Sequence, residues 1–307
     1  MLKLILPLLL LESLYSTNID IDKLRYEFTK DVVETNIFRK RYNKYINSNC
    51  KDNFKCFQKK INYLKQWKSV QNDEKLWSYY KKKSKLFTAE DSYWEKIASK
   101  LNKQNLKLKQ TQFVSIIDLE NQLFIISLYN HNNNKYYFIG KDYISSGNIK
   151  REGEVKLGED HYLKTPSGVF KTQVGWRSNG KYNEDNKTLG YGYKNRYIFY
   201  FGKHKTIRYN TFDDNKNKIY DINKWKLITD DLDFALHAHK STKPMGEAYS
   251  HGCVRTTDEL NRFLDKNAIL HKNMFNGKRW LHKYSKEPEE TKYHDIAGEY
   301  LIVFDKI

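Results

Sequence analysis

The chain has 307 residues and a formal charge of +18, so it is long enough for two domains that each bury a core. Lysine and arginine are spread along the whole length, which excludes a single basic arm as the source of the charge. A charge of this size favours a polyanionic partner or a heavily solvated surface, and it carries no information about the fold.

The first sixteen residues have the outline of a secretory signal. Lys3 precedes an apolar run over residues 4–11 that is interrupted only by Pro7. The run is far shorter than the roughly 20 residues that a membrane-spanning helix needs. Residues 1–16 are therefore predicted to be a signal peptide or an uncleaved N-terminal tether, and the alternative is the buried start of a first helix.

Residues 17–110 are predicted to form a small helical domain. Apolar residues recur there at three- and four-residue spacing, the period of one helix face. No glycine precedes residue 140, which suits long helices with few tight turns. The apolar stripes are Leu24, Phe28 and Val32; Phe54, Phe57, Ile61, Leu64 and Trp67; and Tyr93, Trp94 and Ile97.

The chain has three cysteines, two of them in this helical region. Cys50 and Cys56 are six residues apart and are either a disulfide, in an oxidising compartment, or two buried thiols. Cys253 is then the odd cysteine, which in an exported protein indicates a reactive thiol.

From residue 111 the sequence predicts a mainly β domain that extends to residue 307 with a few short helices. Runs of β-branched and aromatic residues alternate with turn residues, and all fourteen glycines lie in this half. The fold class is therefore α+β, a small helical domain followed by a mainly β domain. The predicted strands cover residues 113–117, 123–129, 136–140, 197–201, 234–237 and 300–304.

A stretch over residues 176–225 is rich in tyrosine, asparagine and glycine. Such a stretch is either a lid over a cleft or a decorated loop with its own hairpin. Both interpretations stay open at this point.

The most informative segment is residues 250–255, with the sequence Ser-His-Gly-Cys-Val-Arg. It places Cys253 beside His251 and just before a predicted helix start with capping-box spacing at residues 256–259. A cysteine close to a helix N-terminus and a histidine is held as a thiolate near neutral pH. Cys253 is therefore predicted to be a nucleophile.

This segment and four upstream elements together resemble the YkuD family of L,D-transpeptidases, which act on the peptide stems of peptidoglycan. The order of the elements matches over residues 111–255, although Ala238 and His239 replace the usual Gly-Thr. The elements are Phe113-Val114-Ser115-Ile116-Ile117-Asp118, Ser145-Ser146-Gly147, Thr165-Pro166-Ser167-Gly168-Val169-Phe170, Leu236-His237-Ala238-His239 with Gly246 after it, and Ser250-His251-Gly252-Cys253 with Arg255.

The resemblance implies a catalytic role for two residues. Cys253 is expected to attack a peptide carbonyl, with His237 as the base and the Ala238 carbonyl as the group that orients the imidazole. The amides of Gly252 and Cys253 are expected to form the oxyanion hole.

Three further residues are expected on the substrate side. Arg255 is expected to pair with a substrate carboxylate, whereas His251 and Ser250 are expected to support substrate binding or the loop. His239 is expected to flank the strand and face solvent. The 165–168 turn, fixed by Pro166, is expected to be structural.

The reaction implied by the resemblance is an acyl transfer that uses no metal or organic cofactor. The thiol attacks the carbonyl of the third stem residue, the terminal D-alanine leaves, and an amine of a neighbouring stem resolves the thioester. The expected partner is the peptidoglycan stem peptide, and the expected location is the periplasm or cell envelope. The oligomeric state stays open, as does the role of the helical domain in dimerisation, wall binding or gating.

Several alternatives remain open at the level of sequence. Water in place of the amine gives an L,D-carboxypeptidase or endopeptidase, and an inert thiol leaves a cell-wall-binding protein without turnover. His237, His239, His251 and Cys253 could instead be four zinc ligands. Nucleic-acid binding by the basic region conflicts with export and is not expected.

Overall fold

The computed structural model describes residues 19–34, 91–150, 154, 156–158, 162–183, 188–189, 191–239, 245–275 and 292–307. The predicted signal segment and Cys50 and Cys56 lie outside the described residues. Within the described residues, no helix is long and apolar enough to cross a membrane.

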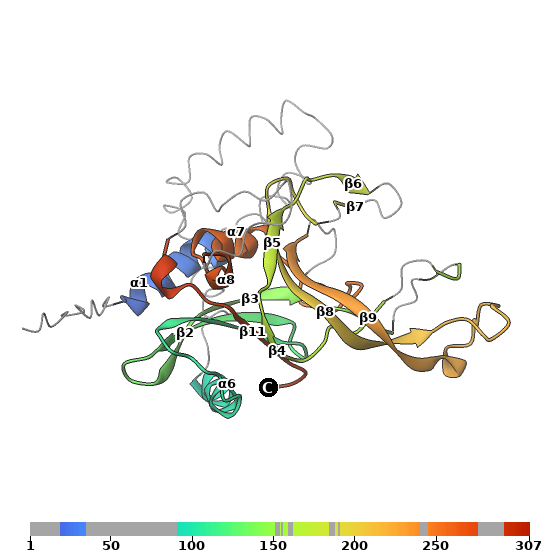
Figure 1. Cartoon of the computed structure of the whole chain (residues 1–307), viewed down its shortest axis with the longest axis horizontal. Helices are drawn as coiled ribbons and strands as arrows, with labels where there is room; N and C mark the ends of the chain where they lie inside the picture. The colour runs from blue at the N-terminus through green and yellow to red at the C-terminus, as the bar shows by residue number, and fades with distance from the viewer. Residues whose placement is uncertain are drawn as a thin grey trace, which may run out of the picture.

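A curled sheet of nine strands dominates the fold (Figure 1), in the order β4-β11-β1-β2-β3-β10-β9-β8-β5. Most neighbours are antiparallel, but β1–β11 and β9–β10 are parallel. The strands are β1 (Gln112–Asp118), β2 (Leu123–Asn130), β3 (Lys135–Ser145), β4 (Gly168–Lys171), β5 (Val174–Arg177), β8 (Tyr197–Asn210), β9 (Lys226–Ala238), β10 (Val254–Thr256) and β11 (Tyr300–Phe304). The predicted mainly β fold and all six predicted strands are confirmed.

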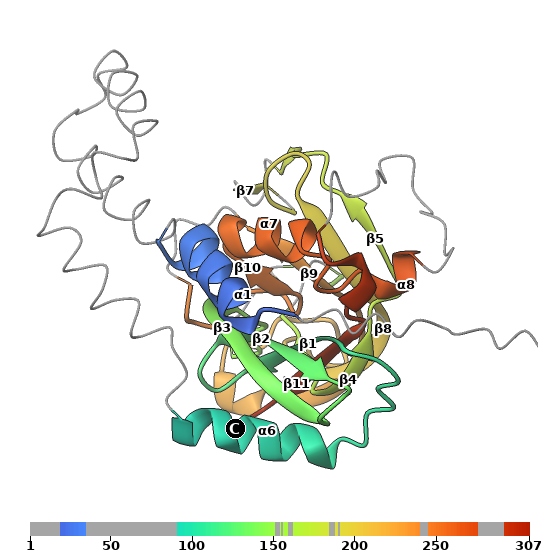
Figure 2. The same ribbon diagram turned by 90° about the vertical axis from the view of Figure 1, so that its left-hand side faces the viewer.

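Helices cover both faces of the β1–β2 part of the sheet, which is why these strands are apolar on both faces. Phe113, Ile117 and Phe124 belong to the core cluster that contains helices α1 (Ile21–Phe28) and α7 (Asp258–Lys266). Val114 and Ile116 belong to a second cluster, under α6 (Asp91–Lys103). Figure 2 shows α1 and α7 on one side of the sheet and α6 on the other.

The described parts of the predicted helical domain pack directly on the sheet. In α1, Leu24 and Phe28 are buried, and the Phe28 ring meets Phe263 of α7 edge to face at 5.2 Å. Gly140 of β3 leaves room for this ring, because a Cβ there would lie 2.1 Å from Phe28 Cδ1. The predicted boundary at residue 110 stays a prediction, but α1, its continuation Thr29–Glu34, and α6 contact the β domain.

The stretch 176–225 holds a small separate two-stranded sheet, β6 (Tyr182–Asn183) with β7 (Thr188–Leu189), and all of β8. Because β8 is a strand of the main sheet, the lid interpretation is wrong for residues 197–210. A short 3-10 turn, Ile222–Lys224, precedes β9. Among the described residues of this stretch, 178–183, 188–189, 191–196 and 211–225 lie outside the strands of the main sheet.

Further short elements complete the C-terminal part: α8 (Lys272–Phe275) and a 3-10 turn, His294–Ile296, lead into β11. Helix α7 begins one residue later than the capping-box spacing predicts. Its N-cap is Thr257, whose hydroxyl accepts a hydrogen bond from Leu260 N at 3.1 Å. Thr256 instead ends β10. The predicted apolar face of this helix is confirmed, since Leu260, Phe263 and Leu264 are all buried.

Candidate active site

The parallel pairing of β9 and β10 brings Cys253 and His237 to one face of the sheet. Its register sets Val254 opposite Leu236 and Arg255 opposite His237. Side chains alternate along a strand, and Val254 and Leu236 point into the core. Cys253 precedes β10 by one residue and lies diagonally from His237. With strands about 4.8 Å apart and a step of about 6.6 Å per two residues, their Cα atoms are about 8 Å apart, which the two side chains together can span.

His237 is buried and neutral, with one ring nitrogen fixed. Nδ1 lies 2.9 Å from the Ala238 carbonyl oxygen, and because a carbonyl only accepts, Nδ1 carries the proton and donates it. Burial lowers the pKa of His237 to about 4; the Ala238 contact opposes this shift and the Arg255 charge adds to it. The other nitrogen, Nε2, is therefore a lone-pair acceptor at neutral pH, as a general base requires.

Cys253 is half-buried, and its surroundings favour the thiol over the thiolate. Burial raises the pKa of Cys253; a backbone contact with Ala235 and the Arg255 charge lower it, and the Asp233 charge raises it again. The sulfur lies 3.4 Å from the Asp233 backbone oxygen. The expected resting thiolate is therefore wrong for the free protein.

The reason lies in the spacing between the cysteine and the helix. The three residues of β10 separate Cys253 from α7, which is about 10 Å of extended chain. The field of a helix terminus falls off within its first turn, so α7 does not stabilise a charge on Sγ. A thiolate at Cys253 would therefore need a base close to the sulfur.

Two upstream elements of the resemblance meet the cysteine loop directly. The Thr165 hydroxyl donates to the Gly252 carbonyl at 2.6 Å and accepts from Gly147 N at 2.9 Å. Gly147 makes this approach possible, because a Cβ there would lie 2.1 Å from the Leu163 oxygen and 2.8 Å from Gly252 Cα. Thr165 of the 165–168 turn thus fixes the loop that carries Cys253.

The other bonds of the loop explain Ser250. Its backbone nitrogen donates to Ser146 O at 2.9 Å, and its carbonyl accepts from Asn148 N at 3.2 Å. Its hydroxyl donates to the Cys253 carbonyl and accepts from Gly252 N. Ser250 therefore shapes the turn in which Gly252, with φ +132°, takes a conformation that favours glycine.

The hydrogen bond between Gly252 N and Ser250 Oγ affects the predicted oxyanion hole. Gly252 N donates to Ser250 Oγ at 3.0 Å, so this amide is engaged in the free protein. Its use as an oxyanion donor would require Ser250 Oγ to turn away. Of the two predicted amides, that of Cys253 needs no such rearrangement.

His251 and Arg255 have different neighbours. The His251 ring stacks on Tyr162 at 4.1 Å between centroids. Arg255 stands between His237 of β9 and Ser145 of β3, its register partners. Its positive charge contributes to the low pKa of His237, so Arg255 lies on the active face.

His239 does not face solvent, so that expectation is wrong. The residue is buried, and burial, followed by the charges of Arg255 and His237, lowers its pKa to about 3. Its ring centroid lies 6.5 Å from that of His237. Across the described residues, which include all four predicted zinc ligands, no group of three or more His, Cys, Asp or Glu side chains is arranged to hold a metal ion.

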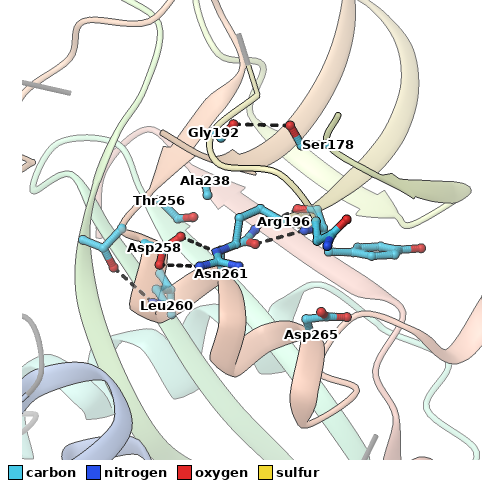
Figure 3. Close-up of polar contacts among 12 residues, drawn as sticks. Ser178, Gly192, Arg196, Ala238, Thr256, Asp258, Leu260, Asn261 and Asp265 are labelled. Atoms are coloured by element: carbon cyan, nitrogen blue, oxygen red, sulfur yellow. Dashed lines mark hydrogen bonds and ion pairs between the residues drawn. The ribbon is translucent and has the colours of Figure 1, made fainter. Parts of the chain in front are cut away.

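Part of the stretch that the sequence offers as a lid or a decorated loop contacts the end of β9 (Figure 3), and the sequence predicts none of these contacts. Arg196 forms a two-bond ion pair with Asp258 of α7, and the Gly192 carbonyl accepts from Ser178 Oγ at 3.3 Å. A Cβ on Gly192 would lie 2.6 Å from the Ala238 oxygen. Tyr191 then meets the His237 ring edge to face at 5.1 Å. These contacts join distant positions, so no local pattern predicts them.

Two further residues beside the sulfur were also missed. Tyr200 of β8 donates its hydroxyl hydrogen bond to Asp233 of β9 at 2.8 Å. Both residues precede the histidine motif and carry no motif of their own. The only available signal was the strand alternation that sets Asp233 and His237 on one face.

The chain is also similar, at low identity, to several solved structures, including the following three. The chain is 18% identical to Bd1075 of Bdellovibrio bacteriovorus (TM-score 0.30), covering 64% of this chain and 49% of that one. It is 16% identical to an L,D-transpeptidase of Xylanimonas cellulosilytica (TM-score 0.29; 64% and 62% covered) and 13% identical to one of Mycobacterium smegmatis (TM-score 0.27; 63% and 59% covered). The chain thus spans about half to three fifths of these proteins.

No curated protein matches the chain. Residues 112–268, just over half of the chain, match the YkuD family, described as the L,D-transpeptidase catalytic domain. This range contains β1 to β10 and all of α7. The chain therefore belongs to the YkuD family of L,D-transpeptidase catalytic domains.

Proposed function

We propose that the chain is a cysteine L,D-transpeptidase that acts on peptidoglycan stem peptides. The observation that carries the proposal is the parallel β9–β10 register, with a neutral imidazole and a thiol on one face. The fixed tautomer of His237 supports the assignment, because its accepting nitrogen is the one not used by Ala238. Membership of the YkuD family supports the substrate class.

The first half-reaction forms a thioester. The Cys253 proton moves to His237 Nε2 while Sγ attacks the carbonyl of the third stem residue. The resulting oxyanion takes a hydrogen bond from the Cys253 amide. Collapse breaks the C–N bond, and His237 returns the proton to the departing D-alanine amine. The second half-reaction passes the acyl group to an amine of another stem.

Arg255 is proposed to pair with a carboxylate of the stem peptide. It lies on the active face beside His237, and a guanidinium binds a carboxylate through two parallel hydrogen bonds. The +18 charge of the chain suits an anionic wall polymer. Export to the periplasm or cell envelope, and a wall-binding or gating role for residues 17–110, belong to the same proposal.

The test compares the intact protein with Cys253→Ala on tetrapeptide muropeptides. We expect the intact protein to release D-alanine and form cross-linked dimers, and Cys253→Ala to change no muropeptide while keeping the wild-type circular dichroism spectrum. Tripeptides without dimers would identify a carboxypeptidase. A wild-type thiol that an acylating inhibitor fails to label would contradict the proposal and favour a wall-binding protein.

A further inference from the structure

Three aspartates lie close together on β9 and differ in their partners. Asp230 and Asp231 each pair with a basic residue of β8, at 2.6 Å and 3.2 Å. Asp233 is exposed and forms no ion pair in the part of the chain that the structure describes. Among the described residues, its carboxylate accepts one side-chain hydrogen bond, from the Tyr200 hydroxyl at 2.8 Å. Basic residues of β8 thus neutralise Asp230 and Asp231, whereas the negative charge of Asp233 has no such partner among the described residues.

The unneutralised aspartate is the one beside the nucleophile. Its backbone oxygen lies 3.4 Å from Cys253 Sγ, and its charge contributes to the raised pKa of that thiol. Asp233, Ala235 and His237 alternate with the buried Phe234 and Leu236, so all three share the active face. The sulfur therefore has an imidazole toward one end of β9 and a carboxylate toward the other.

Tyr200 holds the carboxylate in place. Burial, followed by the Asp233 hydrogen bond and charge, raises the pKa of Tyr200 to about 12. The phenol is thus protonated at neutral pH and donates to one carboxylate oxygen. The second oxygen, Oδ2, takes no other hydrogen bond among the described residues.

We propose that Asp233, positioned by Tyr200, is the specificity residue that binds the ammonium group of the acyl acceptor beside the thioester. The inference rests on the proposed function and names which acceptor its second half-reaction prefers. A cationic amine is attracted by the unpaired carboxylate, whereas a neutral nucleophile gains nothing from it. Asp233 thus favours transfer to an amine over hydrolysis.

The transfer step balances with groups already described. The thioester C–S bond breaks and an amide C–N bond forms. Of the two protons that the acceptor ammonium loses, one reaches Cys253 Sγ through His237, and the other leaves to solvent. Asp233 brings the ammonium to the carbonyl and raises its local concentration.

The test uses the full chain with a tetrapeptide muropeptide as donor and acceptor. The measured quantities are D-alanine release and the ratio of dimers to tripeptides, for wild type, Asp233→Asn and the matched control Asp231→Asn. We expect Asp233→Asn to lower the ratio about fivefold, the size of an exposed charge pair. D-alanine release is recorded in the first turnover, before an acceptor takes part, so that it reports thioester formation alone. Asp231→Asn should keep the wild-type ratio.

A second measurement replaces the ammonium acceptor with hydroxylamine, which is uncharged at neutral pH. We expect the yield of tripeptide hydroxamate to be the same for wild type and Asp233→Asn. An unchanged dimer ratio in Asp233→Asn, an equal fall in hydroxamate, or a wild type that yields only tripeptides overturns the inference and leaves thioester formation intact. A wild type that releases no D-alanine overturns the proposed function as well.

Discussion

At the scale of single residues, the protonation states of the site set its pH dependence. His237 must be neutral to accept the thiol proton, and burial lowers its pKa to about 4. We therefore expect the rate of Cys253 acylation to stay constant as the pH falls through about 6.5, the pKa of free histidine. The rate should fall only below about pH 5, where His237 becomes protonated. Mass spectrometry of the acyl-enzyme after short reaction times measures this rate.

The control for this experiment is a test that the protein stays folded at low pH. Circular dichroism at each pH shows whether the protein stays folded over the measured range. A half-maximal rate near pH 6.5 in a folded protein would contradict the burial of the imidazole.

Sequence alone selected Cys253 and His237 as the proposed reactive pair, because both stand in recognisable motifs. It did not give the protonation state of the thiol. The thiolate expectation failed because it took nearness in sequence to α7 for nearness in space, whereas β10 lies between. Asp233 and Tyr191 were out of reach, since their relation to Cys253 and His237 exists only across paired strands and arching loops.

At the scale of elements, Thr165 links two loops that the chain separates widely. Replacing it with valine keeps the shape but removes the bonds to Gly147 N and the Gly252 carbonyl. A buried group left without a partner costs about 1–3 kcal/mol. We expect Thr165→Val to lower the free energy of unfolding by that amount in urea denaturation and to slow D-alanine release at least tenfold.

Thr165→Ser is the matched control, because it keeps the hydroxyl and loses only a methyl group. We expect it to restore most of the rate. If the serine and valine variants released D-alanine at the same rate, whether both at the wild-type rate or both more slowly, the hydroxyl would not be the group that holds the loop.

The long β8–β9 hairpin shows where element prediction stops. The sequence predicted only residues 197–201 and 234–237, the apolar ends that lie in the core. The outer part carries lysines, arginines and aspartates that are joined across the pair, as in Lys205–Asp231 and Arg208–Asp230. Backbone pairing and such ion pairs extend the two strands beyond their apolar ends. Because the outer residues do not alternate between apolar and polar, the sequence pattern does not predict them as strand.

At the scale of the whole molecule, the N-terminal helix α1 is part of the core that supports the site. Phe28 is fully buried against Phe263 of α7 and against Gly140. We expect Phe28→Ala to lower the free energy of unfolding of the whole protein by about 3–5 kcal/mol, measured by urea denaturation.

Tyr26→Ala is the control on the same helix, because its side chain is 66% exposed. We expect it to change the free energy of unfolding by less than about 0.5 kcal/mol. If Phe28→Ala left the free energy of unfolding unchanged, residues 19–34 would fold independently of the sheet. The apolar stripe of Leu24, Phe28 and Val32 was evident from the sequence, but its partner was not, since periodicity gives a buried face and not what buries it.

The place of β11 in the sheet has a consequence for the order of assembly. This strand, residues 300–304, lies between β4 and β1, so the edge of β1 that faces it stays open until residues 300–304 have been synthesised. Until then the nascent chain carries an unpaired, apolar strand edge, and such an edge recruits other chains.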